Sequence, residues 1–118
     1  MDSRFGTELI HLDGQALLVV WGEVDAAAAA EFDEVCGALA AVTDRLVLDF
    51  TAVTFMDSSG LGVLIEASRR PGFVSIQVRH ASDQVRRVFE ITGMADRFLE
   101  AVAPHELALD QSSSASED

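Results

Sequence analysis

The chain has 118 residues, of which 49% are hydrophobic and 24% charged, and it carries a formal net charge of −12. This length suits one domain that folds without disulfides or metals, and no apolar run approaches the ~20 residues of a membrane span. The acidic excess opposes binding to nucleic acid and to anionic membranes, and favours a basic protein surface as the partner.

Two strands are expected first, over residues 7 to 12 and 16 to 22, joined by Asp13-Gly14, a dipeptide typical of a tight hairpin. The second run is almost continuously apolar, which indicates a strand that is covered on both faces or central in its sheet. An alanine-rich helix should follow from about residue 26 to residue 41, with Asp25 as its N-cap. Apolar spacing predicts that its buried stripe contains Ala28, Phe32, Val35, Leu39 and Val42.

The second half of the chain continues this alternation. A strand over residues 45 to 50 precedes a helix that Pro71-Gly72 stops near Arg69-Arg70, and a strand over 73 to 78 comes next. Ser82 should cap a helix that Gly93 ends, and a short strand over 98 to 102 and a helical turn over 104 to 109 should complete the domain. These elements predict an α/β fold: a mixed, mostly parallel sheet of four to five strands with an N-terminal antiparallel hairpin and about four helices.

The chain ends in Gln-Ser-Ser-Ser-Ala-Ser-Glu-Asp, so we expect the domain to span residues 1 to 110 and residues 111 to 118 to form a disordered acidic tail. The N-terminus lacks the basic and apolar regions of a signal peptide, and we expect a cytoplasmic protein. Cys36 is the only cysteine. No basic residue lies close to it in sequence to lower its pKa, and we expect a small buried hydrophobe rather than a redox thiol.

A polar, glycine-rich stretch, Phe55-Met56-Asp57-Ser58-Ser59-Gly60-Leu61-Gly62, lies between a predicted strand and a predicted helix. Such a junction presents free backbone N–H groups and the positive end of the helix dipole. Asp25 and Asp57 both follow strands that should be parallel. Both should therefore emerge at the same edge of the sheet, which is where open α/β folds place their sites.

Enzymatic interpretations of this stretch meet specific objections. The stretch is neither a Walker A loop, which needs a lysine, nor a dinucleotide fingerprint, whose glycine spacing differs. A receiver-type phosphoacceptor at Asp57 would need a lysine to hold the phosphoryl group, and all eight basic residues of this chain are arginines. A serine hydrolase would need a Gly-x-Ser-x-Gly elbow, which is missing. We therefore expect a binding protein rather than an enzyme, with no metal and no cofactor.

Three segments occur in order along the chain: Gly22-Glu23-Val24-Asp25, then Phe55 to Leu64, then Val88 to Met94 followed by Phe98. Together they strongly resemble the STAS domains of anti-sigma factor antagonists, over about residues 7 to 109. The resemblance implies a bacterial partner switch. In it, the unphosphorylated antagonist binds an anti-sigma factor that is also a serine kinase with a GHKL-type ATP fold, and so frees a sigma factor for transcription.

The resemblance also implies how such a switch is reversed. The kinase phosphorylates the first serine after the aspartate, which ends the complex, and a PP2C-type phosphatase restores the antagonist. By position, the phosphoacceptor here would be Ser58. The alternative is a STAS regulatory subunit of a transporter or another signalling complex without a sigma role, in which the serine is not phosphorylated and the same edge docks another protein.

The expected partner-binding residues surround Ser58. Val63 and Met94 are hydrophobic candidates, because Val63 lies off the main stripe of its helix and Met94 follows a helix stop. Simpler roles stay open. Asp25 and either serine could act only as helix caps, and Asp57 could only end its strand and support the turn. The glycines could serve the close approach of a neighbouring strand or of the partner. The full expected set is Asp25, Asp57, Ser58, Ser59, Gly60, Gly62, Val63 and Met94.

Overall fold

The computed structural model describes residues 4 to 100. Its sheet has the strand order β1-β2-β3-β4, in which β1 is antiparallel to β2 and the other pairs are parallel. The predicted α/β class, with its N-terminal hairpin, mostly parallel sheet and helices, is therefore confirmed. The elements are β1 (Phe5–Leu12), β2 (Ala16–Val24), α1 (Ala29–Ala40), β3 (Arg45–Met56), α2 (Ser58–Arg69), β4 (Ser75–Arg79), α3 (Asp83–Ile91) and α4 (Ala95–Phe98).

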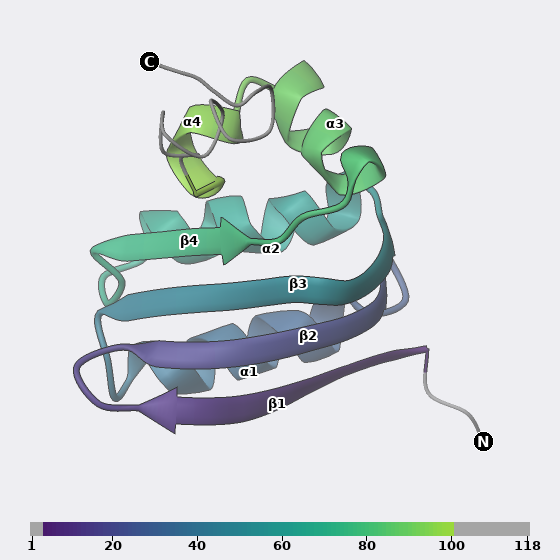
Figure 1. The fold of residues 1–118 in the computed structure, drawn as a ribbon. Helices are drawn as coiled ribbons and strands as arrows, with labels where there is room; N and C mark the ends of the chain where they lie inside the picture. Colours follow the sequence, from purple (N-terminus) through teal and green to yellow (C-terminus); the bar gives the residue numbers. More distant parts are fainter. Residues whose placement is uncertain (1–3, 101–118) are drawn as a thin grey trace, which may run out of the picture.

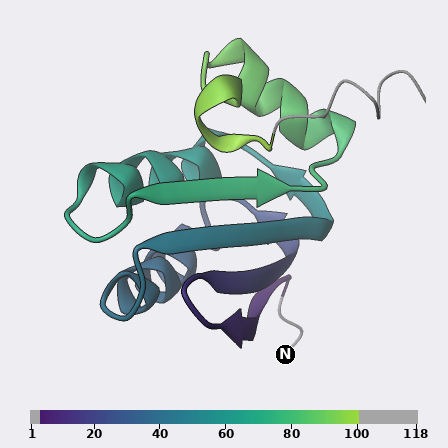
Figure 2. The same ribbon diagram turned by 60° about the vertical axis from the view of Figure 1, so that its left-hand side comes forward.

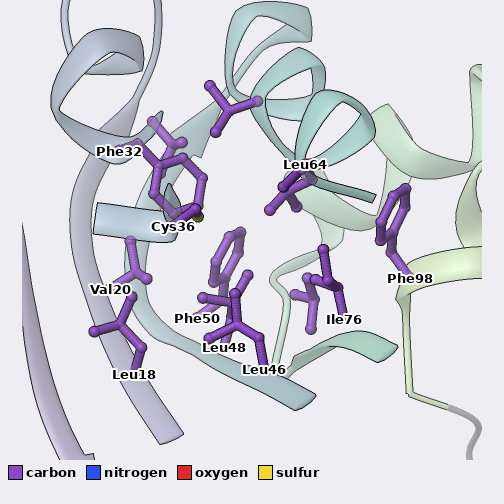
Figure 3. Close-up of a cluster of buried hydrophobic side chains, with 14 of the residues drawn as sticks. Leu18, Val20, Phe32, Cys36, Leu46, Leu48, Phe50, Leu64, Ile76 and Phe98 are labelled. Carbon is purple, nitrogen blue, oxygen red and sulfur yellow. The ribbon is translucent and has the colours of Figure 1, made fainter. Parts of the chain in front are cut away.

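Helices α1 and α2 lie on one face of the sheet, and α3 and α4 lie beyond its β4 edge (Figures 1 and 2). The main core fills the space between the sheet and the first two helices (Figure 3), where side chains such as Phe32, Phe50 and Leu64 are fully buried. Strand β2 is central, as predicted, because it pairs with β1 and β3. Its burial alternates along the strand, so the helices cover only one of its faces.

Helix α1 begins later than predicted. Asp25 does not cap the helix itself, because its Oδ1 accepts a hydrogen bond from the Ala28 N–H at 3.1 Å and closes a turn that precedes Ala29. The predicted place of Val42 in the buried stripe is wrong, since the helix ends at Ala40 and Val42 is 62% exposed. The other predicted residues of the stripe are confirmed: Ala28, Phe32 and Leu39 are buried, and Val35 packs partly buried against the core. Cys36 is buried beside them.

Cys36 lies in the core with 1% of its surface exposed. Burial, followed by the nearby Asp33 carboxylate, raises the pKa of its thiol to about 12. A thiol with such a pKa stays protonated at neutral pH and is a poor nucleophile. The prediction of a small buried hydrophobe is confirmed.

Strand β3 runs to Met56, six residues beyond its predicted end. The extension pairs with the second half of β2, from Trp21↔Ala52 to Val24↔Met56. The segment contains the strand-favouring residues Thr, Val and Phe, and its pairing with β2 continues the strand into the stretch that the sequence predicts as a turn. The strand therefore carries the chain directly to Asp57.

The later elements follow their local signals closely. Helix α2 ends at Arg69, and Ser82 caps α3 by accepting from the Val85 N–H at 3.3 Å. Gly93 takes a φ of +77° just after α3, as expected of a glycine stop. Of the predicted last strand, Phe98 ends α4 and Leu99 forms a parallel bridge with Val78. The predicted helical turn over 104 to 109 and the tail over 111 to 118 lie outside the described residues.

Candidate phosphoacceptor and partner-binding site

The two aspartates leave the sheet side by side. Val24 and Met56 are partners in the parallel register of β2 and β3, and each is followed directly by its aspartate. The Asp57 N–H also donates to the Val24 carbonyl at 3.4 Å, which continues the pairing by one residue. The prediction that Asp25 and Asp57 share one edge of the sheet is therefore confirmed. In Figure 1 this edge is the one toward which β4 points.

Asp57 is the N-cap of α2. Its backbone is extended, with φ −124° and ψ −172°, and its Oδ1 accepts from the Ser59 N–H at 2.9 Å. The Asp57 carbonyl also accepts from the Gly60 N–H at 3.1 Å. Asp57 thus closes the first turn of the helix with both its side chain and its backbone.

Ser58 is the first residue of α2 and is exposed, whereas Ser59 is half-buried. The first turn of α2 contains no acidic residue. A negative group on the Ser58 oxygen would therefore lie at the positive end of the helix dipole, with the capping carboxylate of Asp57 as its acidic neighbour. Ser58 is the more accessible of the two serine hydroxyls.

Gly60 and Gly62 have different surroundings. A Cβ at Gly60 would lie 2.5 Å from the Val24 carbonyl oxygen and 2.6 Å from its Cγ1, so only glycine lets the start of α2 approach β2 this closely. A Cβ at Gly62 would meet nothing within 4 Å. Gly62 comes four residues after Ser58 and therefore lies on the same side of the helix. Because glycine has no side chain, the helix backbone is accessible at this position.

The two hydrophobic candidates are less accessible than the serine. Val63 is 8% exposed and belongs to the core, so the expectation that it lies off the buried stripe is wrong. Helix α2 packs against α1, α3, β3 and β4, which buries a wider face than one helical stripe. Met94 is half-buried against the core, and its N–H donates to the Phe89 carbonyl at 2.8 Å after the Gly93 turn.

Gln84 of α3 is a site residue that the sequence did not indicate. Its Oε1 accepts from the Met56 N–H at 3.0 Å, and its Nε2 donates to the Met56 carbonyl at 2.7 Å. A glutamine in the first turn of a helix carries no local signal for such a contact, because the two residues are 28 positions apart. Gln84 therefore joins α3 to the residue that precedes Asp57.

Neither a metal centre nor a membrane span is evident in the part of the chain that the structure describes. Residues 4 to 100 contain no group of three or more His, Cys, Asp and Glu side chains placed to hold a metal ion. None of the helices within the same range is long and apolar enough to cross a membrane. The chemistry available at the edge is that of carboxylates, hydroxyls and backbone amides.

The serine that follows the capping aspartate lies in the segment on which the resemblance to STAS domains rests. Residues 9–113 match the family model described as Mlab, STAS domain. The anti-sigma-B factor antagonist of Listeria monocytogenes serovar 1/2a is 37% identical over 95 residues, which cover 73% of this chain and 75% of that protein. The chain belongs to the STAS domain family.

Solved structures agree with this assignment. An anti-sigma factor antagonist from Mycobacterium paratuberculosis is 28% identical, with a TM-score of 0.69 over 87% of this chain and 91% of that one. The anti-sigma factor antagonist SpoIIAA in its unphosphorylated form shares the fold with a TM-score of 0.67 at 19% identity, over 94% of this chain and all (100%) of that one. The fold and the family are thus supported by both sequence and structure.

Proposed function

We propose that this protein is an anti-sigma factor antagonist of a bacterial partner switch, controlled by phosphorylation of Ser58. In the cytoplasm, the unphosphorylated form binds an anti-sigma factor with a GHKL-type serine kinase fold and releases a sigma factor. Phosphorylation by that kinase ends the complex, and a PP2C-type phosphatase restores it. The observation that carries the proposal is an exposed serine at the N-terminus of α2, directly after the capping aspartate of the family motif.

The site can accept a phosphate without distortion of the fold. Ser58 is exposed, and the cap that starts α2 is made by Asp57. A phosphoserine at a helix N-terminus is stabilised by the helix dipole. The modified helix should therefore persist, so that the effect of the phosphate is felt at the partner interface.

Electrostatic repulsion explains how one phosphate could end the complex. Two added charges about 6 Å from one fixed acidic group of the partner, at an effective dielectric near 20, cost about 5 kcal/mol. That energy corresponds to roughly a thousandfold loss of affinity or more. A complex of micromolar affinity would then be lost.

The proposed partner-binding surface comprises residues at the carboxyl edge of the sheet, together with Met94, which lies apart from them between α3 and α4. Asp25 and Asp57 give it an acidic character, which a phosphate on Ser58 would make still more negative. Gly62 lets the partner approach the backbone of α2 next to Ser58. Gly60 and Val63 support the surface from inside, through contact with β2 and the core. The exposed and half-buried members are Asp25, Asp57, Ser58, Ser59, Gly62 and Met94.

Phosphorylation of the purified protein by a candidate GHKL-type kinase and ATP, read by mass spectrometry, tests the proposal. We expect one phosphate, on Ser58, in both the wild-type protein and the Ser59→Ala variant. Ser58→Ala should bind the kinase constitutively, whereas Ser58→Asp should bind at least about tenfold more weakly, because a carboxylate supplies part of the phosphate charge.

Phosphate on Ser59 alone would contradict the assignment of Ser58. Absence of phosphate from both serines, together with a partner that still binds this edge, would favour the transporter or other signalling role. Treatment of the phosphorylated protein with a PP2C-type phosphatase should restore kinase binding to the wild-type affinity.

A further inference from the structure

Strand β3 extends well past the end of its neighbour β4. Their register runs from Arg45↔Ser75 to Asp49↔Arg79, so β4 pairs with only the first part of β3. From residue 50 to residue 56, no strand among the described residues lies on that side of β3. The backbone groups there need other partners, because unpaired buried N–H and C=O groups destabilise the fold.

At Met56 the missing strand is replaced by one side chain. The Gln84 amide accepts from the Met56 N–H at 3.0 Å and donates to the Met56 carbonyl at 2.7 Å. A primary amide offers the same donor and acceptor as a peptide group. The pair of bonds reproduces the exchange that a hydrogen-bonded residue pair makes in an antiparallel ladder.

Helix α3 itself is firmly placed. Val85 and Phe89 are fully buried, and Ser82 caps the helix immediately before the turn that carries Gln84. On the opposite side of β3, the Asp57 N–H is bound to the Val24 carbonyl. The segment from Met56 to Asp57 is therefore held between α3 and β2, one residue before Ser58.

We infer that Gln84 is a positioning residue of the Ser58 site: through Met56 it fixes the direction in which Asp57 and Ser58 leave the sheet. This inference rests on the proposed function. Phosphoryl transfer depends on placement of the attacking hydroxyl, and a displacement of about 1 Å can slow such a reaction up to about a hundredfold. The Gln84 side chain binds the backbone of Met56, so it acts on Ser58 through the backbone.

Gln84→Met is the most informative variant, because methionine keeps the length of the side chain and lacks both polar groups. Gln77→Met is the matched control: Gln77 lies on β4, where its Oε1 accepts from the Arg79 Nε at 3.3 Å, away from Met56. Amide hydrogen exchange of the unphosphorylated proteins, followed by NMR, needs no kinase. Leu48, in the part of β3 that pairs with both β2 and β4, provides the reference amide.

In Gln84→Met, exchange at Met56 should be about tenfold faster, as loss of a hydrogen bond predicts, whereas Leu48 should exchange at its wild-type rate. Gln77→Met should leave Met56 unchanged. An equal rise at Met56 and Leu48 would mean that Gln84 only stabilises the whole fold. An unchanged rate at Met56 would mean that the two bonds do not hold the strand end. Either result overturns the inference.

The kinase that phosphorylates the wild-type protein provides the second measurement. We expect Gln84→Met to lower kcat for Ser58 phosphorylation about tenfold and to change KM less than about twofold, because placement of the hydroxyl is lost while the contact surface remains. An unchanged kcat would show that Gln84 does not position Ser58 for phosphorylation. If the wild-type protein itself takes no phosphate, the proposed function fails, and the exchange rates alone then decide whether Gln84 positions this segment.

Discussion

At the scale of single residues, the two glycines of α2 illustrate how the site divides between internal packing and open surface. Gly60 faces the backbone and side chain of Val24, and a Cβ there would overlap both. Gly62 faces open space. Of the two alternatives left by the sequence, close approach of a neighbouring strand therefore holds for Gly60, and close approach of a partner stays a proposal for Gly62.

Substitution by alanine should affect these glycines in opposite directions. Gly60→Ala should destabilise the fold by about 1–3 kcal/mol, because α2 must move away from β2. Gly62→Ala should stabilise it by up to about 1 kcal/mol, the usual gain of alanine over glycine inside a helix. Urea denaturation followed by circular dichroism measures both changes.

Gly62→Ala should nevertheless weaken kinase binding, because a methyl group would fill the space that we assign to the partner. Gly37→Ala is the control: Gly37 lies within α1, and a Cβ there also meets nothing within 4 Å. It should stabilise the protein similarly without weakening binding. Equal affinities of the two variants would exclude Gly62 from the interface.

At the scale of elements, the sequence predicts the ends of α3 well but does not indicate that α3 contacts the end of β3. The N-cap bond of Ser82 and the positive φ of Gly93 define its ends, and both depend only on neighbouring residues. Its connection to the site runs through Gln84, which depends on where the helix packs. The Ser82 cap of α3 therefore supports the end of β3, which is distant in sequence.

Ser82→Ala should lower the free energy of unfolding by about 1 kcal/mol through loss of the N-cap. It should also speed amide exchange at Met56, since Gln84 lies in the turn that the cap stabilises. Ser58→Ala is a suitable comparison. Asp57 supplies the cap of α2, and this exposed serine should change stability by less than about 0.5 kcal/mol. A loss of stability in Ser58→Ala as large as in Ser82→Ala would show that Ser58 also supports its helix.

At the scale of the whole molecule, apolar packing rather than ion pairing holds the described fold together. The ion pairs of the described residues, such as Arg70–Asp33 at 3.3 Å and Arg79–Glu100 at 3.4 Å, join partly exposed side chains. Exposed pairs of this kind contribute little to stability. The net charge of −12 therefore bears on the choice of partner more than on folding.

Phosphorylation of Ser58 should leave the fold intact, because the modified side chain is exposed and lies outside the core. Far-ultraviolet circular dichroism of the phosphorylated and unphosphorylated proteins should give the same helix content. Ser58→Ala, treated with kinase and ATP, controls for effects of the reaction mixture. A loss of helix on modification would favour local unfolding as the cause of dissociation, in place of repulsion at the interface.

The sequence by itself determined the alternation of strands and helices, the cap at Ser82, and the shared edge of Asp25 and Asp57. These features depend on periodicity, turn chemistry and the rules of parallel sheets, which act over a few residues or follow from topology. Only the tertiary structure decided the length of β3, the burial of Val63, the contact of Gly60 with Val24 and the bonds between Gln84 and Met56. Each of these features depends on contacts between residues that are distant in sequence, and such contacts form only when one element packs against another.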